Sequence, residues 1–333
     1  MDTSILFKYR SVTACMKVSY DTITSNITSL LKKTWWASLA LAFLTALTLY
    51  FMMPNKALHD WGIASPWSSY IIQTLVYLGT WLATFVYGAA IWTWINHLSF
   101  KTNLIRNTIV CLIFQVIIFL IVWESNGIQT FFLEHTAHAA STSAATAVAE
   151  PTQAMADGAS FASGMAICAI LGLVNFIIMM LFFVPFQHVL PQVMLKKPNE
   201  KWEIWKSFKT GFHHFGSLFK MVFLGAIIIG IMMCIIFIPI FILTWIQLTA
   251  QLGALDGDPL GLPSLFPLLV IVVFTLVIFI FLYIASWLTL SYAFLFGSNH
   301  TRDLEKIERM KEERIEEERE SRTGIALSHE TQD

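Results

Sequence analysis

Long apolar stretches separated by short polar ones run along most of the chain. Each residue of a helix rises about 1.5 Å, so about 20 apolar residues cross the roughly 30 Å hydrocarbon core of a bilayer. Stretches that approach or exceed this length lie at 34–53, 70–96, 107–123, 164–190, 219–248 and 265–297. The pattern predicts an all-α fold, a polytopic membrane bundle of about six transmembrane helices. The last stretch is the longest, and we expect it to tilt or to project past the bilayer.

The composition supports a membrane protein. Of the 333 residues, 56% are hydrophobic and 13% are charged, whereas about a quarter of the residues of an ordinary soluble domain are charged. The formal net charge of −1 gives no basic field that would attract a polyanion. We therefore expect no nucleic-acid partner.

The positions of Lys and Arg predict the orientation of the spans. Basic residues in short loops are retained on the cytoplasmic side of a membrane. Only Lys56, of the 21 Lys and Arg residues, falls in a segment after an odd-numbered span. Both ends of the chain are therefore predicted to be cytoplasmic. A reporter near Ala145 should be exported, and one near Lys201 should stay in the cytoplasm.

Three parts of the chain are predicted from this topology. Residues 1–33 form a cytoplasmic amphipathic segment, 34–297 form the six-span domain with a flexible exported loop at 124–163, and 298–333 form a charged cytoplasmic helical tail. Opposite charges four residues apart, such as Glu305 and Arg309, favour a solvated helix in the tail. The tail is either a charged extension or a docking site for a protein partner.

Two amphipathic segments precede spans. Apolar residues recur at helical spacing in 12–31, and aromatic residues do so among lysines in 202–215. Each segment either lies in the cytoplasmic headgroup layer, where lysines meet anionic lipid, or packs against the rest of the protein. Membrane lipids are accordingly expected as partners.

A short sequence similarity suggests an internal repeat. SFKT occurs at 99–102 and at 207–210, and the related SYDT occurs at 19–22. Each copy precedes an odd-numbered span, which predicts three hairpins that each follow a cytoplasmic interfacial segment. Chance similarity is the alternative.

The span interiors contain no ionisable residue that would mark a proton or ion pathway. The deepest polar groups are the amides of Gln73, Gln115 and Asn175. These amides either hydrogen-bond across helices or line a transport path, and the first role is expected. No nucleotide-binding, metalloprotease or hydrolase motif occurs, so we expect no enzyme and assign no catalytic, cofactor-binding or metal-binding residues and no cofactors.

Two groups of histidines were considered as sites. Glu134, His135 and His138 fall within about one helical turn and would suit a divalent metal, or they are solvated loop residues, which is the expected case. His213 and His214 would belong to a lipid-modifying site if one existed. Adjacent residues on a helix point about 100° apart, which argues against joint catalysis by this pair.

Four segments carry a likeness to known proteins: KYRSVTACMKVSY, KKTWW, PNKALHDWG and WLTLSYAFLFGS. Together they resemble uncharacterised bacterial six-span inner-membrane proteins, loosely similar to the Yip-like and glycerophosphodiesterase-membrane-domain group. The resemblance implies a multi-pass protein of the bacterial inner (plasma) membrane. It implies no catalytic residues, and no phosphodiesterase domain is present.

These observations predict a non-enzymatic structural or interaction component of the bacterial envelope. The alternative is a passive transporter or channel for a lipid-like or small neutral solute. Pro185 and Pro239, which should kink the fourth and fifth spans, would help to shape such a path.

Overall fold

The computed structural model describes residues 3–52, 66–121, 151–197, 200, 202–255 and 262–330. These residues form helices without any strand, which confirms the all-α fold. The helices are η1 (Thr3–Leu6), α1 (Val12–Ser25), α2 (Ile27–Met52), α4 (Pro66–Asn96), the unlabelled helix Phe100–Ile121, α6 (Pro151–Leu195), α7 (Ile204–His213), α8 (Phe215–Ile236), α9 (Ile238–Leu255) and α10 (Phe266–Glu330).

Six helices in this part of the chain are long and apolar enough to cross a membrane. Their spanning segments are Ile27–Met52, Ile71–Asn96, Phe100–Ile121, Ala169–Leu195, Phe215–Ile236 and Phe266–Glu317. All six carry large apolar side chains that the rest of the protein leaves exposed. Such faces suit hydrocarbon, and the chain is a multi-pass integral membrane protein.

The fifth predicted span is two helices. α8 ends at Ile236 and α9 begins at Ile238, with Phe237 in a turn between them. Pro239 lacks a backbone N–H, and its ring displaces the carbonyl four residues earlier, so a helix cannot pass through this point unchanged. The predicted disruption by Pro239 is confirmed, while Pro185 lies inside the continuous helix α6.

Two boundaries differ from the sequence prediction. The third spanning helix begins at Phe100, so Arg106 belongs to that helix and not to the preceding loop. α6 begins at Pro151, which makes the end of the predicted loop 124–163 helical. Alanine has the highest helix propensity, and proline suits the first helical position. Residues 122–150 lie outside the described residues.

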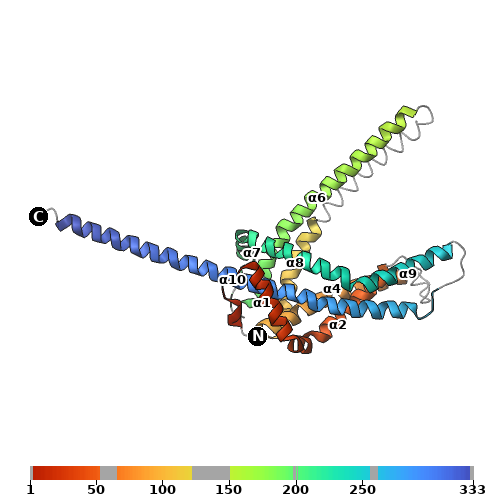
Figure 1. Cartoon of the computed structure of the whole chain (residues 1–333), viewed down its shortest axis with the longest axis horizontal. Coiled ribbons are helices and arrows are strands. Elements are labelled where there is room, and N and C mark those ends of the chain that lie inside the picture. The colour runs from red at the N-terminus through yellow and green to blue at the C-terminus, as the bar shows by residue number, and fades with distance from the viewer. Residues whose placement is uncertain are drawn as a thin grey trace.

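α10 is the centre of the packing. Its membrane part contacts α1, α2, α6, α8 and α9, and η1 lies against it near Gly297. Its last turns run away from all of these helices toward the C-terminus (Figure 1). At about 1.5 Å per residue, its 65 residues make a rod of about 100 Å.

α1 packs on α10 along one face. Cys15, Met16, Ser19 and Ile23 are buried there, whereas Tyr20 is exposed. The indole Nε1 of Trp287 donates to the carbonyl of Met16 at 3.0 Å. Of the two roles open for this segment, packing against the protein is the one that the contacts support.

The spanning helices separate into two groups away from the α1 and α7 end. α6 and the helix Phe100–Ile121 point away from α2, α4, α9 and the first part of α10 (Figure 1). The two groups converge where α1, α7 and the middle of α10 meet. Most of the buried polar side chains gather at this convergence.

The proposed repeat has two similar members and one different member. Asn26 forms the turn between α1 and α2, and His214 forms the turn between α7 and α8, with similar backbone angles at the two turns. In contrast, Ser99 directly precedes the third spanning helix, and its Oγ accepts from the N–H of Thr102. The threefold hairpin repeat stays a prediction.

Candidate functional site

A polar face forms on α10 where this helix leaves the bundle. Phe296, Asn299, His300 and Asp303 follow the spacing i, i+3, i+4 and i+7, which places them on one side of a helix. Asn299 is 4% exposed. This face meets α6 and the α7–α8 turn, which bury Asn299 and part of Asp303, whereas His300 is exposed.

α6 contributes His188 from the opposite side. Its ring lies 5.1 Å from the ring of Phe296 and 5.9 Å from that of His214, between centroids. His188 is 3% exposed. Gln192 follows one turn later on the same face of α6.

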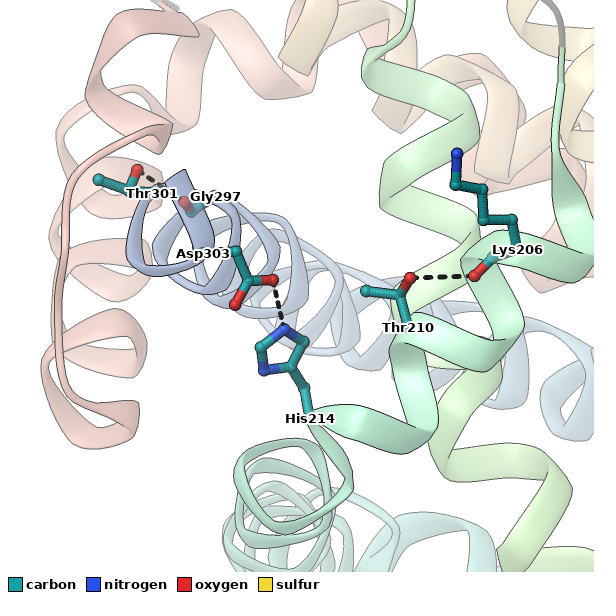
Figure 2. Close-up of polar contacts among 6 residues, drawn as sticks. All are labelled: Lys206, Thr210, His214, Gly297, Thr301 and Asp303. Carbon is teal, nitrogen blue, oxygen red and sulfur yellow. Dashed lines mark hydrogen bonds and ion pairs between the residues drawn. The ribbon is translucent and has the colours of Figure 1, made fainter. Parts of the chain in front are cut away.

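The turn between α7 and α8 places His214 against α10. Its Nε2 lies 2.8 Å from Oδ2 of Asp303 (Figure 2), and the His214 side chain is 6% exposed. His213, the preceding residue, is exposed, and the planes of the two rings differ by 77°. The two ring centroids lie 5.1 Å apart, and the absence of joint catalysis by these histidines stays a prediction.

Three buried polar atoms of the cluster have no hydrogen-bond partner among the described residues. They are Nδ1 of His188, Oε1 of Gln192 and Nδ2 of Asn299. Buried polar groups in folded proteins are nearly always satisfied, and ordered water commonly completes such networks. We refer to these three residues with His214, His300 and Asp303 as the junction cluster.

α7 holds the His214 turn in place through a close approach to α6. Gly211 packs on the backbone of Pro185, where an added Cβ would lie 2.8 Å from the carbonyl oxygen. Ser207 is buried beside it, and its hydroxyl donates to the carbonyl of Glu203. Thr210 similarly donates to Lys206, and Thr301 donates to Gly297 of α10, within their own helices (Figure 2).

A second polar region caps the C-terminal end of α6. The guanidinium of Arg106 donates to the carbonyls of Val193, Lys196 and Lys197 at 2.7–3.1 Å. These carbonyls are at or just past the last turn of α6, where the negative end of the helix dipole favours a cation. Arg106 is 1% exposed, so it is a structural cap that the sequence pattern placed in a loop.

Asparagines join α4 to the helix Phe100–Ile121 beside this cap. The amide of Asn103 donates to Thr93 and to Asn96, and Asn96 donates to the carbonyl of Met194. Asn107 donates to the carbonyl of Phe85. These hydrogen bonds fix three helices to one another, although the buried Nε of Arg106 has no partner among the described residues.

The N-terminal segment is hydrogen-bonded to α10 beside the junction cluster. Arg10 and Ser298 exchange two hydrogen bonds of 2.8 Å, with the hydroxyl accepting from the Arg10 N–H and donating to its carbonyl. Gly297 faces the carbonyl of Leu6 so closely that no Cβ would fit. The two end segments of the bundle therefore lie on the same side of it.

The structure assigns a packing role to one amide that the sequence singled out. Gln115 accepts a hydrogen bond from the indole of Trp81 on α4. Gln73 and Asn175 are partly exposed on α4 and α6. Glu134, His135 and His138 lie outside the described residues. Within those residues, no group of three or more His, Cys, Asp or Glu side chains is arranged to hold a metal ion.

Sequence reasoning missed the junction cluster. His188 is at the end of a predicted span and Asp303 is in a charged tail, so neither stood out. The available signal was the i, i+3, i+4, i+7 spacing that places Asn299, His300 and Asp303 on one helix face with Phe296.

The chain matches no family model, no curated protein and no solved structure. The fold defines a multi-pass α-helical membrane protein.

Proposed function

We propose that this protein is a non-enzymatic interaction component of a bacterial inner membrane, which holds a charged cytoplasmic helix at a fixed position and offers it to a partner protein. The observation that carries the proposal is the continuity of α10. One helix runs from the most densely packed part of the bundle into an exposed tail.

The membrane half of α10 is well suited to anchoring. Phe274, Leu290 and Phe294 are at most 1% exposed and pack against several neighbouring helices. Lipid tails are as apolar as these side chains, so a spanning helix is held by close van der Waals packing against its neighbours. The helix is therefore held over many turns before it leaves the bundle.

The tail half is suited to recognition. Every described side chain from Leu304 to Glu317 is exposed. Leu304, Ile307 and Ile315 lie on one face by helical spacing, each about half exposed. Amphipathic helices of this kind bind by placing the apolar face into a groove of the partner. The mixed charges around that face would select a groove edged by charges of both signs.

The same-side arrangement of the two end segments supports an even number of spans. With the bias of Lys and Arg, it favours a cytoplasmic tail. A reporter fused near Lys201 should be active only as a cytoplasmic reporter, and one near Ala145, outside the described residues, only as an exported one. The opposite pair of activities would overturn the orientation.

Association through the tail is tested by truncation. The full chain and a chain ending at Leu304 are purified from the native host in native-lipid particles, and the co-purifying proteins are identified. We expect one protein to co-purify with the full chain and not with the truncated chain, when both chains are present in the membrane in equal amounts. An identical set of proteins with both chains would contradict the proposal.

A further inference from the structure

A row of aromatic rings runs from α7 into α8 on the surface of the protein. It consists of Trp205, Phe208, Phe212, Phe215, Phe219 and Phe223, which we call the aromatic ridge. Successive ring centroids lie 5.1–6.4 Å apart along the whole row. The contacts order these rings into one continuous apolar surface.

Much of this surface is not covered by protein. Trp205 is 77% exposed, Phe223 is 60% exposed, and Phe212 and Phe219 are each exposed by more than two fifths. Trp205 and Phe212 lie on α7, outside the spanning helices, where two exposed aromatic rings in line exceed the scattered apolar residues of an ordinary surface. The ridge therefore needs an apolar occupant.

Lysines flank the ridge on one side. On α7, Lys209 and Lys206 lie about 40° and 100° around the helix from Trp205, whereas Phe208 and Phe212 lie on its other side. Ser207 and Gly211 are buried, so the aromatic and lysine edges share the exposed side. Lys220 is exposed beside Phe219 on α8.

The positive charge at this edge is only partly neutralised. Glu203 lies 3.2 Å from Nζ of Lys206, with both side chains largely exposed. No ion pair is formed by Lys209 or Lys220 with the described residues. An exposed pair of this kind contributes little, so the edge keeps a net attraction for anions.

We propose that the aromatic ridge and its lysine edge form a binding site for an anionic phospholipid. The phosphate lies against Lys206 and Lys209, and an acyl chain follows the ridge from Trp205 toward Phe223. Charge complementarity selects this occupant, because a neutral lipid would leave the lysines without a counter-charge. The site does not depend on the tail or on its partner.

Trp205 provides the readout, because brominated acyl chains quench nearby indoles. The full chain is reconstituted in phosphatidylcholine vesicles that contain phosphatidylglycerol, with bromine on only one of the two lipids. The protein has 12 Trp residues, so the Trp205 signal is obtained as the difference from Trp205→Phe. The expected result is a preference for brominated phosphatidylglycerol of roughly tenfold at equal mole fraction.

A double variant with Lys206→Gln and Lys209→Gln should lose this preference and keep equal quenching by both lipids. The matched control, Lys306→Gln with Lys311→Gln in the tail, should retain it. Equal quenching of Trp205 by both lipids in the unaltered protein would overturn the proposal. Quenching by neither lipid would overturn it as well, since a second copy or another protein would then cover the ridge.

Discussion

Nε2 of His214 lies 2.8 Å from a carboxylate oxygen of Asp303, at the last point where α10 touches the rest of the bundle. From the next residue to Glu317 the described side chains of α10 are exposed. The pair therefore marks the boundary between the packed and the exposed parts of α10. Loss of the pair should act first on residues 298–306, where the tail leaves the bundle.

We predict that His214→Ala and Asp303→Asn each increase local opening of α10 at residues 298–306. A hydrogen bond to a charged group contributes about 1.5–3 kcal/mol, and the Asp303 side chain is about a third exposed, so the effect should fall at the lower end. Amide hydrogen exchange in residues 298–306 should accelerate roughly tenfold. Mass spectrometry of the exchanged peptides measures this.

His213→Ala is the matched control, because its ring is exposed beside that of His214. It should leave exchange in 298–306 unchanged. Equal acceleration by His213→Ala, or none by either substitution at the pair, would show that the pair does not hold the tail.

Gly297→Ala should destabilise the seam between η1 and α10. The new Cβ would collide with the carbonyl of Leu6, a backbone atom that cannot rotate away, at a cost of about 1–3 kcal/mol. Thermal unfolding in detergent should shift to lower temperature. In Gly230→Ala, a Cβ meets nothing within 4 Å, and the melting temperature should not fall. A wild-type melting temperature for Gly297→Ala would contradict the packing.

Arg106→Gln should weaken the end of α6. The substitution removes the guanidinium from three carbonyls, of which only that of Val193 is on a buried residue. The loss should cost about 1–3 kcal/mol. Arg106→Lys should recover only part of the loss, because an ammonium cannot reproduce the fork geometry. Faster amide exchange near Val193 is the readout, with exposed Lys101→Gln as the control. Wild-type exchange rates near Val193 in Arg106→Lys would show that positive charge alone caps α6, without the fork geometry of the guanidinium.

Cys15 should resist thiol reagents. Burial raises the pKa of its thiol to about 11, against a smaller lowering by Arg10, so the reactive thiolate is scarce at neutral pH. In a single-cysteine protein, maleimide labelling should keep rising with pH above 9, where an ordinary thiol has levelled off. Exposed Tyr9→Cys supplies that ordinary thiol. Equally rapid labelling of both positions at pH 7 would contradict the burial of Cys15.

The sequence predicted the class of the protein because apolar length and the Lys and Arg bias act locally. It located six spanning helices and a kink at Pro239. It did not predict that the fifth span divides into two helices at Phe237, since a run such as IIFIPIFI reads as apolar on either side of Pro239. It missed the junction cluster because His188, His214 and Asp303 come from three separate segments. Only the packing of α6, α7 and α10 brings them together.

The same limit applies to Arg106. A basic residue next to an apolar run normally marks a loop, and only the position of the α6 end shows that this one is a cap. By contrast, the amphipathic pattern in 12–31 did indicate a helix. Its partner, α10, is nearly 300 positions away in the chain, so local periodicity could not name it.

The central proposal is that the tail of α10 binds a partner protein. Site-specific photo-crosslinking in living cells tests this most directly. A photoreactive amino acid replaces Ile307 in the full-length protein, and a second variant carries it at Leu269, which is half exposed on the membrane part of α10. We expect a protein adduct of one defined mass from Ile307 and none of that mass from Leu269. An Ile307 variant that reaches the membrane at normal levels and yields no protein adduct, with the same outcome at Leu304 and Ile315, would contradict the account.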